Sequence, residues 1–121
     1  MNLSISNKGE KPIYEQLYEQ ISAQILNGEL KADECLPSIR VISKELGISV
    51  ITVKKAYELL EFHRFIYTRA GKGCFVAEHA EHKRNEKRLS LAEERLKEQL
   101  PYFQGLQLSK EELIALVDKL Y

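Results

Sequence analysis

The chain has 121 residues, enough for one ordinary domain and a small appendage, and its 18 basic and 18 acidic residues give a formal net charge of zero. Hydrophobic residues make up 44% of the sequence, which is typical of a folded protein, and no apolar run reaches the roughly 18 residues that a membrane helix needs. The N-terminus shows no secretory signal, and two cysteines are too few for a disulfide scaffold, so we expect a cytoplasmic protein that does not enter a membrane.

Residues 1–11 are expected to form a loose arm, and a first helix is expected to follow from Pro12. Its apolar side chains recur every four residues, a spacing that lines one face of a helix. These side chains are Ile13, Leu17, Ile21 and Ile25. Gly28 is expected to end the helix, and Leu30 and Leu36 are expected to fill the core from the linker that follows.

Two short helices separated by a tight turn are predicted next. Ser38 is suited to begin the first because its hydroxyl can accept a hydrogen bond from a helix start, and Gly47 is suited to end it. Its apolar face would contain Ile39, Ile42 and Leu46. Ser49 would begin the second helix, with Ile48 and Val53 at the spacing of a hydrophobic staple. The buried stripe of that helix would be Val53, Ala56, Tyr57 and Leu60, with Val50, Ile51, Lys54, Lys55 and Glu58 facing out.

A β-hairpin is predicted after these helices, because two short β-prone runs, residues 65–68 and 74–76, enclose a glycine-rich loop. The loop contains Arg69, Gly71, Lys72 and Gly73. Residues 37–73 carry seven Lys or Arg against three Asp or Glu, a charge of +4, whereas residues 1–36 carry −3 and residues 74–121 carry −1. The basic excess therefore lies in helices and a loop whose order suits a DNA groove and its phosphates.

The remaining residues predict two amphipathic helices. A polar run at residues 78–88 is either a linker or the solvated start of the first of them, and Pro101 is expected to kink or end that helix. The four residues from Ser109 have the pattern of a capping box at the start of the second helix, with Leu108 and Leu113 as a hydrophobic staple. Apolar side chains at helical spacing are Leu89, Ala92, Leu96, Leu100 and Phe103 in the first helix and Leu113, Leu116, Val117 and Leu120 in the second.

Two helices of this size are too small to enclose a core, so another surface must cover their apolar faces. A second copy of the chain would provide that surface, and we expect a homodimer; the alternative is that the helices fold back onto the first domain. We place a DNA-binding domain at residues 1–77 and a helical dimerisation region at residues 78–121. The residues predicted at the dimer contact are Leu89, Leu96, Leu100, Leu113, Leu116, Val117 and Leu120.

Several motifs, in a fixed order over about the first two thirds of the chain, resemble the GntR family of bacterial transcription regulators. These motifs are Pro12-Ile13-Tyr14-Glu15-Gln16, Leu36-Pro37-Ser38-Ile39-Arg40, Glu45-Leu46-Gly47-Ile48-Ser49, Thr52-Val53-Lys54-Lys55-Ala56-Tyr57 and Gly71-Lys72-Gly73-Cys74-Phe75-Val76. The short remainder, with residues 108–114 at the start of its last helix, is similar to the small YtrA-type subfamily. The resemblance implies a mainly α winged helix-turn-helix with a two-helix dimerisation tail. It also implies a dimer that binds a near-palindromic DNA operator, usually as a repressor.

The resemblance also implies roles for individual residues. Arg40 matches an arginine at a helix start that contacts DNA, the recognition helix contributes Ser49, Thr52 and Lys54, and the wing tip that enters the minor groove contributes Gly71 and Lys72. Physical reasons agree, because helix N-termini favour phosphate and flanking glycines let a loop approach the DNA backbone closely. The full set of predicted DNA contacts is Ser38, Arg40, Ser49, Val50, Thr52, Lys54, Lys55, Arg69, Gly71, Lys72 and Gly73.

Two places depart from the family pattern. Val50, followed by Ile51, stands where the family often has a polar or basic residue. This pair either packs on thymine methyl groups or braces the turn between the two helices. Arg64 stands where the family commonly has a glycine that ends the recognition helix, so the backbone there is either strained or turns in another way.

Other kinds of site have less support. His79 and His82 have a spacing that a metal site could use, but nothing completes a recognised ligand set, and solvent-facing histidines are the simpler interpretation. Cys35 and Cys74 could form a redox switch, although each also fits as a small, partly buried side chain. The triplet at residues 71–73 is too short for a nucleotide-binding loop, and no catalytic arrangement has a supporting motif. We therefore expect no enzyme activity and no cofactor.

The partners expected are a double-stranded DNA operator and a second copy of the chain. A small-molecule effector would have to bind at the dimer interface or between the domains, because the 44 residues after Ala77 are too few to enclose a sizeable pocket. The alternative function is a protein-interaction module that uses a winged helix as a docking surface without operator specificity. Arg40, Lys54 and Lys72 distinguish the two, because a docking module does not need all three cations on one face.

Overall fold

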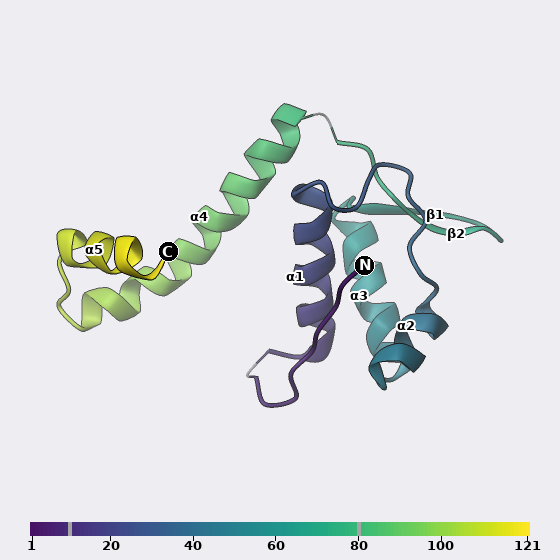
Figure 1. Cartoon of the computed structure of the whole chain (residues 1–121), viewed down its shortest axis with the longest axis horizontal. Coiled ribbons are helices and arrows are strands. Elements are labelled where there is room, and N and C mark those ends of the chain that lie inside the picture. The colour runs from purple at the N-terminus through teal and green to yellow at the C-terminus, as the bar shows by residue number, and fades with distance from the viewer. Residues whose placement is uncertain (10, 80) are drawn as a thin grey trace. The chain divides into compact units, whose positions relative to one another are not determined.

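The structure is a computed structural model of the chain, and it describes residues 1–9, 11–79 and 81–121. Its elements are α1 (Ile13–Leu26), α2 (Ile39–Leu46), α3 (Val50–Phe62), β1 (Ile66–Arg69), β2 (Gly73–Val76), α4 (Glu81–Gly105) and α5 (Lys110–Leu120) (Figure 1). The mainly α fold with a small β-hairpin is the predicted one. Contacts within the chain divide it into two compact units, Met1–Glu81 and His82–Tyr121. None of the described helices is both long and apolar enough to cross a membrane.

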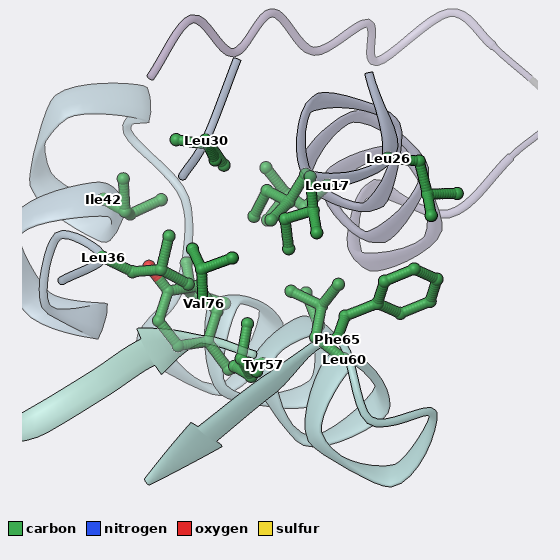
Figure 2. Packing of buried hydrophobic residues seen from close by; sticks show 14 residues of the cluster. Leu17, Leu26, Leu30, Leu36, Ile42, Tyr57, Leu60, Phe65 and Val76 are labelled. Carbon is green, nitrogen blue, oxygen red and sulfur yellow. The ribbon is translucent and has the colours of Figure 1, made fainter. Parts of the chain in front are cut away.

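The core of the first unit is built from the apolar faces of three helices and the hairpin. Both α1 and α2 pack against α3, which also packs against β1. The four-residue stripe of α1 is buried as predicted, except that Ile13 at its start is half-buried, and the linker residues Leu30 and Leu36 are buried as well. Figure 2 shows labelled members of this cluster from all three helices, the linker before α2, the residue just before β1, and β2: Leu17, Leu26, Leu30, Leu36, Ile42, Tyr57, Leu60, Phe65 and Val76.

The N-terminal arm is bound to α1, so the prediction of a loose arm is wrong for its first residues. Three glutamines hydrogen-bond the arm's backbone: Gln16 bonds Ser6, Gln20 bonds Ser4 and Gln24 bonds Asn2. The glutamines are four residues apart in α1, a rise of about 6 Å, and their partners are two residues apart in the extended arm, a rise of about 6.6 Å. The two spacings match, so each glutamine reaches the arm's backbone. Leu3 and Ile5 pack against the core from the arm. Residue 10 lies outside the described residues.

The second and third helices form the helix-turn-helix. Ser38 Oγ accepts a hydrogen bond from the Val41 N–H at 3.2 Å, and Ser49 Oγ accepts one from the Thr52 N–H at 3.1 Å. Both helices therefore begin at the predicted caps. Gly47 ends α2 with a φ of 65°, a left-handed conformation that glycine adopts without steric cost. The residues of α3 that are buried are the four predicted ones.

The antiparallel strands β1 and β2 form the hairpin, which we call the wing (residues 66–76). Ile66 faces Val76, and Arg69 faces Gly73 across the strands. The linker before α2 runs beside β2, because Cys35 pairs with Phe75 in a short antiparallel bridge. The wing is therefore attached to the segment that leads into the helix-turn-helix.

The turn from α3 into the wing places Arg64 in the left-handed region, with a φ of 62°. The Arg64 N–H donates to the Glu61 carbonyl, and the Phe65 N–H donates to the Leu60 carbonyl. This pair of bonds commonly closes a helix around a left-handed glycine. Arg64 therefore adopts the left-handed backbone conformation that a glycine adopts easily at the end of a helix. Because arginine has a Cβ, this conformation is expected to cost roughly 1–2 kcal/mol.

Replacing Arg64 by glycine is expected to raise the free energy of unfolding by up to about 1 kcal/mol. The relief of strain exceeds the extra chain entropy that glycine gives the unfolded state. Urea denaturation followed by circular dichroism measures the change. Arg64→Ala keeps the strain and serves as the control, so an equal gain in both variants would contradict the explanation.

In the second unit no described residue of α4 or α5 is buried. Because α4 begins at Glu81, most of the polar run at residues 78–88 is the solvated start of a helix and not a linker; residue 80 lies outside the described residues. The helix continues through Pro101, which therefore does not end it, and the ribbon changes direction toward its C-terminal end (Figure 1). The predicted capping box is present, because Ser109 and Glu112 exchange hydrogen bonds between side chain and backbone. These bonds lower the pKa of the Glu112 carboxyl.

Candidate nucleic-acid interface

The outer edge of α3 is exposed, while the opposite face of the helix lies in the core. The outward residues are the predicted ones: Val50, Ile51, Lys54, Lys55 and Glu58. Val50 and Ile51 are 46% and 79% exposed, so neither of them braces the turn. Ile48 has that role, because it is half-buried and packs against the core. The edge therefore presents apolar side chains first and cationic side chains one turn later.

The hydroxyl groups at the start of α3 are engaged with the helix itself. Ser49 Oγ accepts from the Thr52 N–H and lies 2.8 Å from the Thr52 hydroxyl. Ser38 is occupied in the same way at the start of α2. These side chains fix where the helices begin. The remaining backbone N–H groups of each first turn, together with the positive end of the helix dipole, are the groups suited to a phosphate.

Tyr57 connects α3 to the segment before α2. Its hydroxyl donates to the Pro37 carbonyl at 2.6 Å. Burial raises the pKa of Tyr57, so the hydroxyl stays protonated and remains a donor. In the turn itself, the Ser43 hydroxyl donates to the Ile48 carbonyl. The first bond attaches the segment that leads into α2, close to the exposed Arg40, to α3, and the second joins α2 to the turn before α3.

The two lysines on α3 have different surroundings. Lys55 Nζ lies 3.9 Å from the centroid of the Tyr14 ring, a cation–π contact that holds the ammonium group beside the first turn of α1. Lys54 is exposed on the edge of α3, three residues after Ile51. Lys55 therefore lies against an aromatic ring of another helix, and Lys54 is the cation next to the apolar part of the edge.

The wing holds an arginine over two stacked aromatic rings. Tyr67 and Phe75 face each other across the strands, with ring centroids 5.6 Å apart and planes 22° from parallel. The guanidinium carbon of Arg69 lies 5.7 Å from the Tyr67 ring and 5.8 Å from the Phe75 ring. The Tyr67 hydroxyl donates to the Asp33 carboxylate at 2.6 Å, which raises the pKa of Tyr67. The rings thus position Arg69 next to the wing tip.

The tip of the wing is a tight turn that exposes one cation. The Lys72 N–H donates to the Arg69 carbonyl at 2.9 Å, which closes the turn. Gly71 has a φ of 75°, and no atom lies within 4 Å of the place where a Cβ would stand. Glycine is therefore needed here for its backbone conformation and not for space. Lys72 and both flanking glycines are exposed, so bare backbone and one ammonium group form the tip.

The predicted DNA contacts fall in two groups, both in the first unit. Ser38, Arg40, Ser49, Val50, Thr52, Lys54 and Lys55 lie on α2, α3 and their caps, and Arg69, Gly71, Lys72 and Gly73 lie at the end of the wing. Sequence reasoning missed the residues that position the cations, namely Tyr14, Tyr57, Tyr67 and Phe75. The hairpin register could have revealed the last pair, because the two residues stand equally far from the loop. That these groups touch DNA stays a prediction.

The histidines and cysteines form no site in the part of the chain that the structure describes. Within residues 1–9, 11–79 and 81–121, no three His, Cys, Asp or Glu side chains gather to hold a metal ion. Cys35 pairs with Phe75, so these two side chains lie on the same face of the strands. Cys74 directly precedes Phe75 in β2, and successive side chains of a strand alternate, so Cys74 points to the opposite face from Cys35. That pairing does not fit a disulfide between them. Cys35 is exposed, contrary to expectation, and Cys74 is half-buried as expected.

A capped helix, a glycine turn, a second helix with an exposed edge and a basic hairpin tip define a winged helix-turn-helix, a class of DNA-binding fold. Residues 13–76 match the model of the gntR family of bacterial regulatory proteins. The transcriptional repressor YtrA of Bacillus subtilis is 31% identical over 110 residues, which cover 89% of this chain and 85% of that protein. The chain belongs to the GntR family and to its YtrA type, as its motifs predicted.

Solved structures support both the winged helix-turn-helix fold and its role in binding DNA. A transcriptional antiterminator from Listeria monocytogenes EGD-e is 34% identical, with a TM-score of 0.81 over 98% of this chain and 89% of that one. AraR(DBD), solved in complex with operator ORX1, is 29% identical, with a TM-score of 0.57 over 64% of this chain and 99% of that one. The chain is a DNA-binding transcription regulator. Two other curated relatives that it matches are much longer, and the chain spans 15% and 31% of their length.

Proposed function

We propose that this regulator acts as a homodimeric repressor that binds a near-palindromic operator, with residues 1–77 as the DNA-binding domain. The observation that carries the proposal is the exposed edge of α3, in a unit whose wing ends in Lys72 between two glycines. AraR(DBD), which has the same fold, was solved with an operator, and YtrA is named a repressor. As a regulator of this kind the chain would act in the cytoplasm, by binding and without catalysis.

Selection of duplexes from a randomised library, followed by anisotropy titration, tests the DNA part of the proposal. We expect selected duplexes to share a sequence and to bind far more tightly than unselected ones. The affinity should also fall steeply with salt, because neutralised phosphates release counterions. About six phosphate contacts in a dimer would give a slope near −5 for log K against log salt. Equal affinity for all duplexes, or a complex insensitive to salt, would favour a protein-interaction module instead.

The exposed apolar side chains of α4 and α5 support the homodimer. Six of the seven residues predicted at the dimer contact are exposed, and Leu113 is half-buried. Further large apolar side chains are exposed on the same two helices and the turn between them: Leu91, Tyr102 and Ile114 on the helices and Leu106 in the turn. A monomer rarely exposes so much apolar surface on adjacent helices. Residues 78–121 are therefore proposed as the dimerisation region.

Leu116→Glu is expected to raise the dissociation constant of the dimer at least roughly a hundredfold. Each dimer would lose two buried leucines, each contributing about 1.5–3 kcal/mol, and would gain two charges at the contact. Sedimentation equilibrium measures the constant. Ala115→Glu introduces the same charge on the opposite face of α5 and is the control. A monomeric wild-type chain, or equal effects of the two substitutions, would refute the proposed contact.

A further inference from the structure

Ile51, the second residue of α3, has a side chain that is 79% exposed. Among the apolar residues of this helix only Phe62, at its far end, is as exposed. Ile51 does not stabilise the turn, since Ile48 packs there, and it does not belong to the core. The hydroxyls of Ser49 and Thr52 on either side are hydrogen-bonded to each other. The first turn of α3 therefore presents mainly the methyl groups of Ile51 and Val50.

Two lysines follow these apolar side chains one turn later on α3. Lys54 and Lys55 stand three and four residues after Ile51, so they are its neighbours on the helix surface, and the first turn of α3 contains no acidic residue. The positive end of the helix lies there as well. An ordinary apolar protein partner would leave these charges without a match. A polyanion that carries an apolar group would satisfy both features.

On double-stranded DNA the only apolar group at a base edge in the major groove is the C5 methyl of thymine. We propose that Ile51 packs on a thymine methyl group in each operator half-site, with Lys54 directed to a flanking phosphate. This inference rests on the proposed operator binding and adds a specificity-determining residue to it. It requires thymine at a fixed position of each half-site.

The test removes only the methyl group. Duplexes selected from a randomised library by the full-length protein are resynthesised with deoxyuridine in place of thymidine, one symmetric pair of positions at a time. For wild type, one such pair should weaken binding by about fourfold per half-site, the ratio that corresponds to one buried methyl group. Ile51→Ala should bind the parent duplex about as weakly and should lose its sensitivity to deoxyuridine at that pair.

Val41→Ala provides the matched control, because Val41 is an apolar residue on α2 with 44% exposure. It should retain the full sensitivity to deoxyuridine. The inference is overturned if no thymidine pair responds in wild type, or if Ile51→Ala responds as wild type does. If selection enriches no sequence at all, the proposed operator binding itself fails, which is a different result. Ile51 is exposed, and circular dichroism should show that its replacement leaves the fold intact.

Discussion

Phe65→Ala is expected to lower the free energy of unfolding of the Met1–Glu81 unit by about 3–5 kcal/mol, the range for deleting a buried phenyl ring. Phe65 is fully buried, and its ring lies edge-on to Tyr18 of α1, with centroids 5.9 Å apart. Its backbone bonds both Leu60 in α3 and Ala77 after β2. The residue therefore joins helices and wing through its backbone, while its ring lies in the core. Such a loss is a large share of the 5–15 kcal/mol typical of a domain.

Phe62→Ala is the control for this experiment. It removes the same ring three residues earlier, where the side chain is 79% exposed, so a change within about 0.5 kcal/mol is expected. Urea denaturation of both variants, followed by circular dichroism, gives the two values. Similar losses in the two variants would show that the ring of Phe65 is not the centre of the core.

The parts of the fold that sequence predicted correctly depend on neighbours in the chain. Ser38, Ser49 and Ser109 begin helices because each hydroxyl reaches an N–H three residues later, a bond that needs no tertiary structure. The apolar stripe of α1 is equally local, since a four-residue period selects one face of any helix. Such features can be recognised from the sequence, because the residues that form each of them are close together in the chain.

The parts that sequence did not predict depend on pairs far apart in the chain. The arm was expected to be loose because its own residues show no helix or strand pattern, yet Gln20 bonds Ser4 across 16 positions. Lys55 was placed on the outer edge correctly, but the Tyr14 ring beneath its ammonium group comes from another helix. Arg69 was recognised as a loop cation, whereas the stacked rings that hold it became visible only with the strand register. Sequence thus located the cations, and the structure shows what positions them.

Arg40→Ala is expected to weaken binding to a selected operator by about 1–3 kcal/mol per half-site, the value of a bidentate arginine contact with a base pair. A homodimer carries two such arginines, so the total loss of about 2–6 kcal/mol would weaken binding by roughly thirtyfold to roughly twenty-thousandfold. Arg40 is exposed at the start of α2, so its removal should leave the fold intact. Anisotropy titration against one operator duplex measures the change, with Lys119→Ala on α5 as the control.

Arg40→Lys separates the two ways in which this arginine could act. Lysine keeps the charge but has no planar fork, so an interaction with a base edge would be weakened nearly as much by lysine as by alanine. A simple phosphate interaction would survive in the lysine variant, and alanine would then lower the salt slope by about one for each phosphate that is no longer neutralised. Equal affinities for Arg40→Ala and Lys119→Ala would remove Arg40 from the interface. In that case the cations of α3 and the wing would have to provide the binding without α2.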